Sequence, residues 1–465
     1  MKLAPLGKKP LPKPLPLLRL IGPSFILLGL GLGSGEIILW PYLVANWGLG
    51  IIWGALLGIT FQFFMNMEIE RYTLATGESV FVGFARKLGR LSPVWFILST
   101  LIPWMWPGII ASSGKLLAQV AGLSDHRYIS IGLLLLIGAI LTLGPTLYKT
   151  VERFQKTIIL LGVPFILVLV FLTASNGEFL MLLKGLVGVG EGYRFLPPGI
   201  ALASFLAAFA YTGAGGNLNL AQSYYVKEKG YAMGIHSGKI TSLLTGKSET
   251  IELEGSTFEA HSENLASFKK WWKVANIEHL IVFWGTGLLT ILLLSLLAYS
   301  NVFGLTGTGA SINFVILEGS TIGAKVIPFV GTLFITVAAI FLFATQLTVL
   351  DATSRIMAEN TVIFSPQKFL IANLPKFYYL FLWIQVILGI AIFALGIGEP
   401  LFLLTVGAVL NALAMFVHIG ATLWLNLTSL EKSIRPALLR IGIMLLAFIF
   451  FGGFSIFTLS QYILK

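Results

Sequence analysis

Eleven stretches of this 465-residue chain are long and apolar enough to cross a lipid bilayer. The hydrocarbon core of a bilayer requires about 20 consecutive apolar residues per helix. Charged residues make up 11% of the chain, less than half of the ~25% that is typical of a soluble domain. The sequence therefore predicts an all-α polytopic membrane protein with eleven transmembrane helices, over residues 20–47, 50–68, 93–114, 128–145, 156–174, 198–224, 277–300, 326–350, 376–397, 400–425 and 436–460.

The lysine and arginine residues predict how these helices are oriented. With the N-terminus placed in the cytoplasm, 25 of the 31 basic residues fall in cytoplasmic segments and 6 on the outer side. An excess of basic residues in cytoplasmic loops sets the orientation of membrane proteins. We therefore expect a multi-pass protein of the cell (inner or plasma) membrane, with its N-terminus in the cytoplasm and its C-terminus outside. This distribution accounts for the net charge of +11 without nucleic acid, so the expected partners are the bilayer and a small ion or molecule.

Two segments lie outside the predicted spans. Residues 1–19 contain KKPLPKPLP, which is typical of a loose, polyproline II-like cytoplasmic tail. Residues 230–276 form a cytoplasmic insert, and residues 262–279 at its end carry apolar side chains at helical spacing beside three lysines. This pattern predicts an amphipathic helix on the inner leaflet, which either leads into span 7 or has a regulatory or partner-binding role.

Spans 1 and 6 are interrupted in matching ways. Span 1 reads LGLGLGSGEIILWP and span 6 reads YTGAGGNLNLAQ, so each has a glycine cluster near its middle followed by a polar side chain. Corresponding broken helices in two halves of a chain are typical of secondary transporters with inverted repeats and a substrate site at the midplane. The glycines of span 1 also form GxxxG pairs, so close helix packing is the other interpretation. The predicted division is a first repeat over 20–175, a second repeat over 198–229 and 277–425, and one extra helix over 436–460.

Glu36 is the acidic residue that the sequence places near the middle of a span. An unpaired carboxylate inside a bilayer costs ~2.5 kcal/mol or more. No lysine or arginine lies near the middle of a predicted span, where it could pair with Glu36. We therefore expect Glu36 to face a cavity, to bind a cation or to hold a proton.

Other polar residues complete the set of candidates. Asp351 and Arg355 are four residues apart near the cytoplasmic end of span 8, which favours a structural ion pair or an inner gate. His418 in span 10 suits either a proton relay or a packed, hydrogen-bonded histidine, and Glu68 closes span 2 either at the interface or on an exit path. The expected substrate ligands around Glu36 come from both breaks and from span 8: Gly33, Ser34, Gly213, Asn217, Asn219, Gln346 and Thr348.

Several functional classes are disfavoured by what the sequence lacks. The chain contains no cysteine and five histidines, and it has no GxxxxGK[ST] phosphate-binding loop. Thiolate metal sites and a transport ATPase are therefore not expected. Neither an intramembrane His/Glu metal motif nor a Ser–His pairing is visible, so we expect no enzymatic activity and no cofactor.

The segment GPSFILLGLGLGSGE resembles the first span of the Nramp divalent-metal transporters, whose pattern is GPGF followed by DPGN at the break. The stretch ERYTLATGESV after span 2 is similar to the RLGxxTG segment of that family, and FATQLT in span 8 is similar to AAGQSS. The resemblance implies a LeuT-like fold, with a five-plus-five inverted repeat and one extra helix. It also implies transport of a divalent metal by alternating access.

The departures from the Nramp pattern fall on its metal ligands. The aspartate of the family aligns with Gly33 and its asparagine with Glu36, while its MPH motif falls on Asn217, Leu218 and Asn219. The carboxylate is therefore displaced by three residues, about 300° around a helix, and the thioether and histidine are missing. Carboxylate and amide oxygens suit Mg²⁺, Ca²⁺ or Mn²⁺ better than a softer metal. The sequence thus predicts a hard, oxygen-ligated cation of the Mg²⁺ or Mn²⁺ kind.

A second resemblance leads to a different substrate. GSGEIILWP is also similar to the GSGI-type turn of amino-acid permeases, in which amides at half-helix ends hold a substrate carboxylate. Glu36 would then engage the ammonium group of the substrate or a coupling proton. Symport of an amino acid or another small solute by the same fold is therefore the alternative to metal transport.

Overall fold

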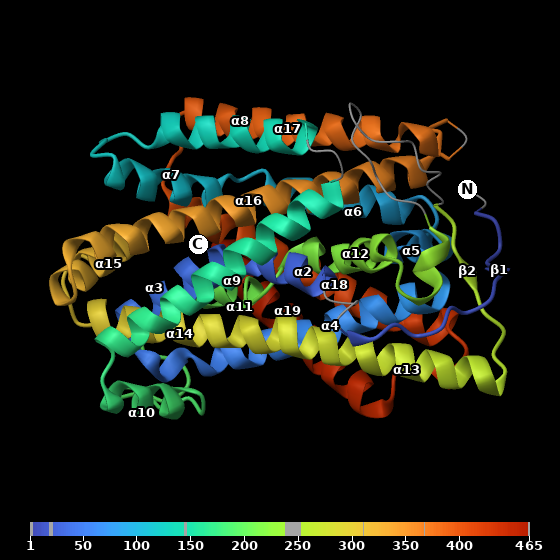
Figure 1. Cartoon of the computed structure of the whole chain (residues 1–465), viewed down its shortest axis with the longest axis horizontal. Helices are drawn as coiled ribbons and strands as arrows, with labels where there is room; N and C mark the ends of the chain where they lie inside the picture. Colours follow the sequence, from blue (N-terminus) through green and yellow to red (C-terminus); the bar gives the residue numbers. More distant parts are fainter. Residues whose placement is uncertain are drawn as a thin grey trace.

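The computed structural model describes residues 3–17, 22–143, 147–237, 253–309, 311–366 and 368–463. The described chain is predominantly α-helical, and most helices run along the long axis of the molecule (Figure 1). The α-helices are α2 (Pro23–Gly31), α3 (Trp40–Trp47), α4 (Trp53–Thr76), α5 (Val80–Leu88), α6 (Leu91–Trp104), α7 (Gly108–Val120), α8 (Arg127–Leu143), α9 (Leu147–Thr173), α10 (Asn176–Gly185), α11 (Leu202–Ala210), α12 (Gln222–Lys229), α13 (Ser262–His279), α14 (Thr286–Val302), α15 (Asn313–Lys325), α16 (Pro328–Phe364), α17 (Leu374–Ala394), α18 (Pro400–Ser429) and α19 (Leu438–Ile463).

Nine helical segments of the described chain are long and apolar enough to cross a membrane. They correspond to nine of the predicted spans. The predicted span 4 is α8, an apolar helix of 17 residues, and the predicted span 6 is divided between α11 and α12, which are shorter still. The multi-pass, all-helical architecture is therefore established, while the count of eleven stays a prediction.

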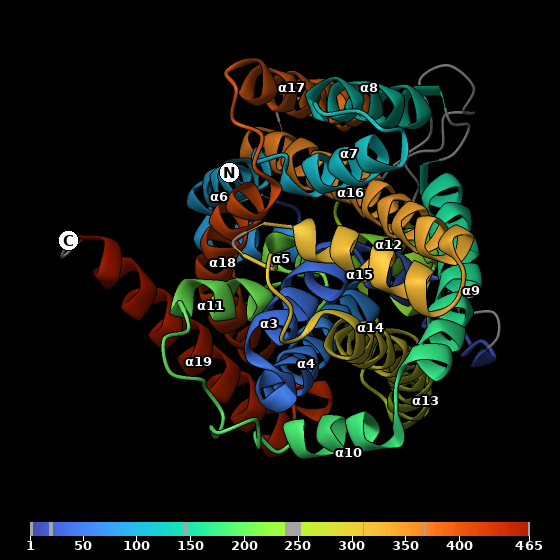
Figure 2. The ribbon, with the colours of Figure 1, turned by 90° about the vertical axis from the view of Figure 1, so that its left-hand side faces the viewer.

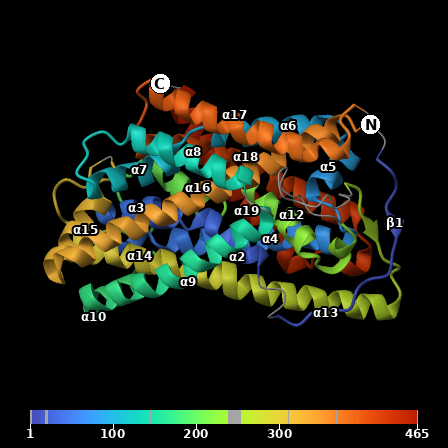
Figure 3. The same ribbon diagram turned by 45° about the horizontal axis from the view of Figure 1, so that its top comes forward.

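The two ends of the helix bundle differ in what covers them. The short helices α10 and α15 lie at one end, and α5, the two strands and the start of α13 lie at the other (Figures 1 and 3). Figure 2 looks onto the first end, where α15 lies across the bundle, and shows α8 and α17 packed side by side along one edge. Elements predicted to be cytoplasmic thus gather at a single end of the molecule.

The helix predicted over residues 262–279 is present as α13. It continues through the π-helical turn η5 (Leu280–Gly285) into α14, giving one helical segment of 41 residues from Ser262 to Val302. Trp272 of α13 stacks on the guanidinium groups of Arg71 and Arg440, with the Cζ atoms 3.8 and 4.9 Å from its ring centroid. Span 7 is therefore extended by a helix that packs against spans 2 and 11.

The N-terminal tail is held in place over its described residues. Strand β1 (Gly7–Lys8) pairs in parallel with β2 (Ser256–Thr257) of the insert. Trp271 Nε1 of α13 donates a hydrogen bond of 2.8 Å to the carbonyl of Pro12. The tail and the insert thus form one layer at the end of the bundle where β1, β2 and the start of α13 lie, whereas the proline-rich sequence suggested a loose tail.

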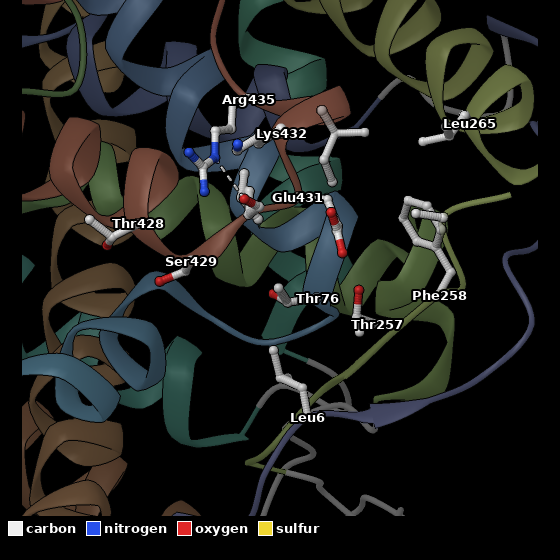
Figure 4. Close-up of a pocket in the computed structure, with 13 residues that line it drawn as sticks. Leu6, Thr76, Thr257, Phe258, Leu265, Thr428, Ser429, Glu431, Lys432 and Arg435 are labelled. Carbon is white, nitrogen blue, oxygen red and sulfur yellow. Dashed lines mark hydrogen bonds between the residues drawn. The ribbon is translucent and has the colours of Figure 1, made fainter. Parts of the chain in front are cut away.

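A cavity of about 460 Å³ lies beneath this layer (Figure 4). Its walls come from the tail, β2, the start of α13 and the segment that joins α18 to α19. Glu431, Lys432 and Arg435 give it charged groups of both signs, and Arg435 Nε donates to the carbonyl of Leu430 at 2.8 Å. The cavity lies at this end of the bundle and does not involve the predicted substrate ligands.

Candidate functional site

The break predicted in span 1 is present. Helix α2 ends at Gly31, residues 32 and 33 form a turn, and the chain continues as a π-helical turn, η1 (Ser34–Leu39), before α3 begins at Trp40. Glu36 therefore lies on the π-helical turn, directly after the break. Such turns in place of regular α-helix are frequent at functional sites.

The break predicted in span 6 is also present. Helix α11 ends at Ala210, and regular helix resumes as the 3₁₀ turn η3 (Gly216–Ala221), which leads into α12. Gly213, Gly215 and Gly216 have φ angles of 130°, 73° and 56°. A side chain at these positions would be strained, because L-residues rarely adopt positive φ. Glycine is thus what allows the chain to turn here.

The two breaks lie against each other. A Cβ atom on Gly31 would lie 2.6 Å from the backbone of Gly213, and one on Gly35 would lie 1.7 Å from the carbonyl oxygen of Tyr211. Both glycines of span 1 are therefore needed for direct backbone contact with span 6. The glycine clusters therefore have both of the roles that the sequence suggested. They interrupt the two helices, and the interrupted segments are also the surfaces at which spans 1 and 6 pack against each other.

Glu36 is fully buried and faces span 7. Its Oε2 accepts a hydrogen bond from the hydroxyl of Thr290 in α14. Its Oε1 has no hydrogen-bond partner in the described chain, and a Cβ on Gly287 would lie 3.6 Å from it. The carboxyl group thus lies between spans 1 and 7, with one oxygen that no protein donor satisfies.

The two asparagines of span 6 point to different helices. The Nδ2 of Asn217 donates to Ser99 Oγ at 2.8 Å and Thr100 Oγ1 at 3.0 Å, both in α6. The Nδ2 of Asn219 donates to Gln62 Oε1 at 3.0 Å and Asn66 Oδ1 at 2.8 Å, both in α4. The side-chain oxygens of Asn217 and Asn219 are buried and have no partner among the described residues.

Span 8 contacts the glycine cluster of span 1 through its threonines. Thr345 Oγ1 donates to the carbonyl of Gly29 at 2.9 Å, and a Cβ on Gly33 would lie 2.5 Å from the same hydroxyl. Thr348 accepts a hydrogen bond from Gln155 of α9 and donates to the carbonyl of Ala344 at 2.9 Å. Ser34 and Gln346 are 2% and 5% exposed, so both lie within the bundle.

The Asp351–Arg355 pair predicted within span 8 is present. Arg355 Nε donates to both carboxylate oxygens of Asp351, at 2.9 and 3.0 Å, and Arg355 is 1% exposed. The same guanidinium binds Glu228 at the end of span 6, and the hydroxyl of Tyr378 in span 9 donates to Asp351 at 2.9 Å. The pair therefore joins three spans near the end of the bundle where the insert lies.

His418 and Glu68 have mainly structural contacts. The Nε2 of His418 lies 2.9 Å from the carbonyl oxygen of Gly216, and since a carbonyl can only accept, this nitrogen carries the hydrogen. Glu68 forms a two-point ion pair with Arg71 and a further one with Arg440, at 3.3 Å. These contacts tie span 10 to the break in span 6, and span 2 to span 11.

Two important partners were not among the residues singled out from the sequence. Gln62 of α4 donates through Nε2 to the carbonyl of Ala210 at 3.0 Å and accepts through Oε1 from the backbone of Gly215 at 3.3 Å. Thr290 is the hydroxyl that holds Glu36. Gln62 could have been noticed as an amide within the apolar run FQFFMN, but the sequence contains no signal that pairs Thr290 with Glu36.

The atoms of this region that could coordinate a cation are oxygen atoms. The described chain contains no group of three or more His, Cys, Asp or Glu side chains that could hold a metal ion. A cation would therefore depend on the Glu36 carboxylate, on amide oxygens such as that of Asn217, and on carbonyls freed at the breaks. Among the described residues, the hydrogen bonds of Glu36 and those of Asn217 and Asn219 go to different helices.

Comparison with solved structures gives this fold a known counterpart. The chain is similar to mutants of the manganese transporter of Eremococcus coleocola, with a TM-score of 0.72 and 12% identity over 98% of this chain and 90% of that one. The same transporter in complex with an aromatic bis-isothiourea substituted compound gives a TM-score of 0.70 at 12% identity, over 96% and 87%. No protein-family model matches the sequence, and a search of curated proteins found no match. The similarity therefore establishes a shared fold, which agrees with the Nramp-like resemblance.

Proposed function

We propose that this protein is a secondary active transporter that moves a hard divalent cation, such as Mn²⁺ or Mg²⁺, across the cell membrane by alternating access. The observation that carries the proposal is Glu36, a fully buried carboxylate directly after the break in span 1, with an oxygen that no described protein group satisfies. A carboxylate is kept inside a bilayer at a cost of several kcal/mol, so a functional role is the default interpretation.

The chemistry of the neighbouring groups supports a hard cation. Asn217 and Asn219 use their amide nitrogens as donors to α6 and α4, which leaves their oxygens as acceptors. Hard cations prefer oxygen ligands, whereas softer metals prefer sulfur and nitrogen. In our proposal Glu36 supplies the charge, and Asn217, Asn219 and carbonyls near Gly33 and Gly213 supply neutral oxygens when the two breaks close on the ion. Ser34, Gln346 and Thr348 are further ligands.

The packing of the glycines argues against the alternative of a bulkier solute. Glycine-rich walls would leave room for an amino acid if they faced a cavity. Instead, Gly31 and Gly35 are in backbone contact with span 6. The space beside the breaks is thus taken up by the protein itself in this conformation, and a bare metal ion requires less rearrangement than an amino acid.

The Asp351–Arg355 pair is the proposed inner gate. Arg355 of span 8 forms ion pairs with Asp351 and with Glu228 of span 6. If the inner half of span 6 moves, either the Arg355–Glu228 ion pair breaks or Arg355 moves with Glu228. An ion pair that is buried and hydrogen-bonded is costly to separate, which makes it suited to holding one side closed. His418 is a candidate for coupling through its bond to Gly216, and Glu68 is a candidate for the exit path.

Metal flux into proteoliposomes tests the proposal. The full-length protein is reconstituted around a divalent-sensitive dye, and Mn²⁺, Mg²⁺, Ca²⁺ and Cd²⁺ are added in turn. We expect saturable entry of Mn²⁺ or Mg²⁺, and we expect Glu36→Gln to reduce it at least about tenfold, the equivalent of ~1.4 kcal/mol in binding. Glu399→Gln, at a half-exposed carboxylate at the start of α18, is the matched control and should transport normally.

The outcomes separate the candidate substrates. Cd²⁺ entry above all other metals would show that an all-oxygen site is wrong. No metal entry in wild-type protein that elutes as a single folded species would exclude metal transport, and uptake of labelled amino acids would then be the next measurement.

A further inference from the structure

Spans 1 and 7 meet at a second place, on the other side of the break from Glu36. Ser24 in the first turn of α2 forms a hydrogen bond with Glu278 Oε2, and its Oγ lies 2.8 Å from His279 Nδ1. Ser24 and His279 are fully buried, and Glu278 is 2% exposed. A serine, a carboxyl group and an imidazole are thus enclosed together between α2 and the end of α13.

Counting hydrogens shows that this cluster can exist in two protonation states. A hydroxyl has one hydrogen to donate, yet Ser24 Oγ has a polar partner on each side. One of the two contacts must therefore be donated to Ser24, either by a protonated Glu278 or by an N–H at His279 Nδ1. The first arrangement, with a hydrogen on His279 Nε2, holds one proton more than the second.

The surroundings enclose the cluster and place charged groups beside Glu278. His279 is stacked between the rings of Phe63 and Phe283, at 5.6 and 4.6 Å, and its Nε2 has no hydrogen-bond partner within the described residues. The charged groups that face Glu278 from other helices are Glu70 of α4, Lys156 of α9 and Lys229 of α12.

Of these neighbours, Glu70 is buried, and the two lysines are partly exposed. The Oε2 of Glu70 accepts a hydrogen bond of 3.1 Å from Gln222. Lys156 and Lys229 both bind Glu152, at 2.8 and 2.9 Å, and their side chains are 29% and 24% exposed. The buried cluster therefore lies next to an ionic rim that is open to solvent.

We propose that Ser24, Glu278 and His279 form a proton-binding relay that couples transport to the movement of a proton. The inference rests on the proposed transport function and names its coupling ion. The protonated Glu278 passes its hydrogen to Ser24 Oγ while Ser24 passes its own to His279 Nδ1, and a water molecule that reaches the ring when α2 moves takes the hydrogen from Nε2. The products are a Glu278 carboxylate, a Ser24 hydroxyl that donates to it, and a neutral His279, so that one proton leaves and no other bond changes.

The position of Glu278 links this proton to the conformation of span 1. Its Oε1 lies 3.4 Å from the backbone nitrogen of Gly22, the residue that caps the N-terminus of α2. A carboxylate at a helix N-terminus is stabilised by the helix dipole, and a neutral carboxyl group is not. Protonation of Glu278 therefore weakens the attachment of α2. Because α2 is only nine residues long and ends at the break, it can then move as a separate piece.

The test measures metal and proton entry together. The full-length protein is reconstituted with a pH-sensitive dye and a divalent-sensitive dye inside, and Mn²⁺ is added outside. Wild-type protein is expected to acidify the interior as Mn²⁺ enters. Glu278→Gln and His279→Phe are expected to admit Mn²⁺ down its gradient while acidification falls to the level of empty liposomes. His261→Asn, at the residue that caps the N-terminus of α13, and Glu263→Gln, in its first turn, change exposed residues and serve as controls that should behave as wild type.

A second measurement does not depend on the substrate. Infrared difference spectra of the purified full-length protein, recorded across a pH step, should contain a protonated-carboxyl band that Glu278→Gln removes. His279→Phe keeps an aromatic ring between Phe63 and Phe283, so this variant should fold. If Glu278→Gln does not fold, the transport assay is interpreted from His279→Phe.

The outcomes distinguish the relay from the transport function. Acidification per Mn²⁺ that is unchanged in both variants would overturn the relay and leave metal transport standing. If wild-type protein transports no metal, the proposed function fails, and the infrared band then decides the proton site: its loss in Glu278→Gln supports the site, and its persistence overturns it.

Discussion

The breaks in spans 1 and 6 use glycine for different purposes. In span 1, Gly31, Gly33 and Gly35 have ordinary negative φ angles, and their role is to let other atoms approach where a Cβ would lie. In span 6, Gly213 and Gly215 hold positive φ angles that an L-residue would adopt only with strain. A glycine cluster in a membrane helix can therefore allow either a close backbone contact or a sharp turn, and the amino-acid sequence alone does not distinguish the two.

The breaks also differ in how their polar groups are satisfied. Gln62 and His418 together bond the backbone of residues 210, 215 and 216 in span 6. Within the described chain, Glu36 after the break in span 1 has the hydroxyl of Thr290 on one oxygen and no partner on the other. Span 6 is thus a well-supported joint, whereas span 1 keeps a buried carboxyl oxygen that no described group satisfies. Four substitutions test this contrast, taken from the largest expected effect to the smallest.

Gly35→Ala should abolish folding. Its new Cβ would lie 1.7 Å from the carbonyl oxygen of Tyr211, which belongs to the backbone and cannot move aside without displacing span 6. We expect a loss above about 4 kcal/mol, the range of exceptional point mutations, seen as the absence of monodisperse protein in detergent. Gly453→Ala in α19 meets no atom within 4 Å and should purify normally. Equal yields of the two variants would show that the breaks are not in tight contact.

Gln62→Leu should destabilise the joint in span 6. It leaves the Ala210 carbonyl, the Gly215 amide and the Asn219 side chain without this partner, and each unsatisfied buried group costs about 1–3 kcal/mol. We expect a loss of roughly 3 kcal/mol or more in denaturant unfolding. Gln119→Leu, at an exposed amide near the end of α7, should change stability by less than ~0.5 kcal/mol. If both variants behave alike, Gln62 does not support the break.

Thr290→Val should show that the Thr290 hydroxyl stabilises the buried carboxyl group of Glu36. Hydrogen bonds to charged groups contribute about 1.5–3 kcal/mol, so the variant should lose stability in that range. In a Glu36→Gln background the same change should cost only about 1 kcal/mol, because the hydrogen bond then joins two uncharged side chains. Thermal or denaturant unfolding of the four proteins of this cycle gives the comparison. An equal cost in both backgrounds would mean that Thr290 does not stabilise the charge.

Gly29→Ala should have the smallest effect. Its Cβ would meet the side-chain amide of Gln155, at 2.3–2.7 Å, and a side chain can rotate away where a backbone cannot. We expect a loss of about 1 kcal/mol, partly offset by the better helix propensity of alanine. Gln155→Ala should remove the clash, so that Gly29→Ala becomes neutral or stabilising in that background when unfolding is measured. A cost as large as that of Gly35→Ala would show that close contact at span 1 is equally strict throughout.

The sequence alone determined where the backbone is interrupted. Apolar runs of about 20 residues predict membrane helices because a bilayer leaves a chain few other options. Glycine clusters within two of these runs predicted breaks, which the structure places after Gly31 and Ala210, and the i,i+4 spacing predicted the Asp351–Arg355 pair. Each of these features depends on neighbours along the chain, so a local pattern is sufficient to find it.

Only the tertiary structure decided what each polar group contacts. Glu36 and Thr290 are 254 residues apart in the sequence, and Ser24 and His279 are 255 apart. The asparagines that the sequence grouped with Glu36 donate instead to α6 and α4, and the tail that looked loose is paired with the insert. These partners depend on how helices rotate and pack against one another. In a bundle of similar apolar helices, that rotation is set by many close contacts at once, so no single sequence motif encodes it.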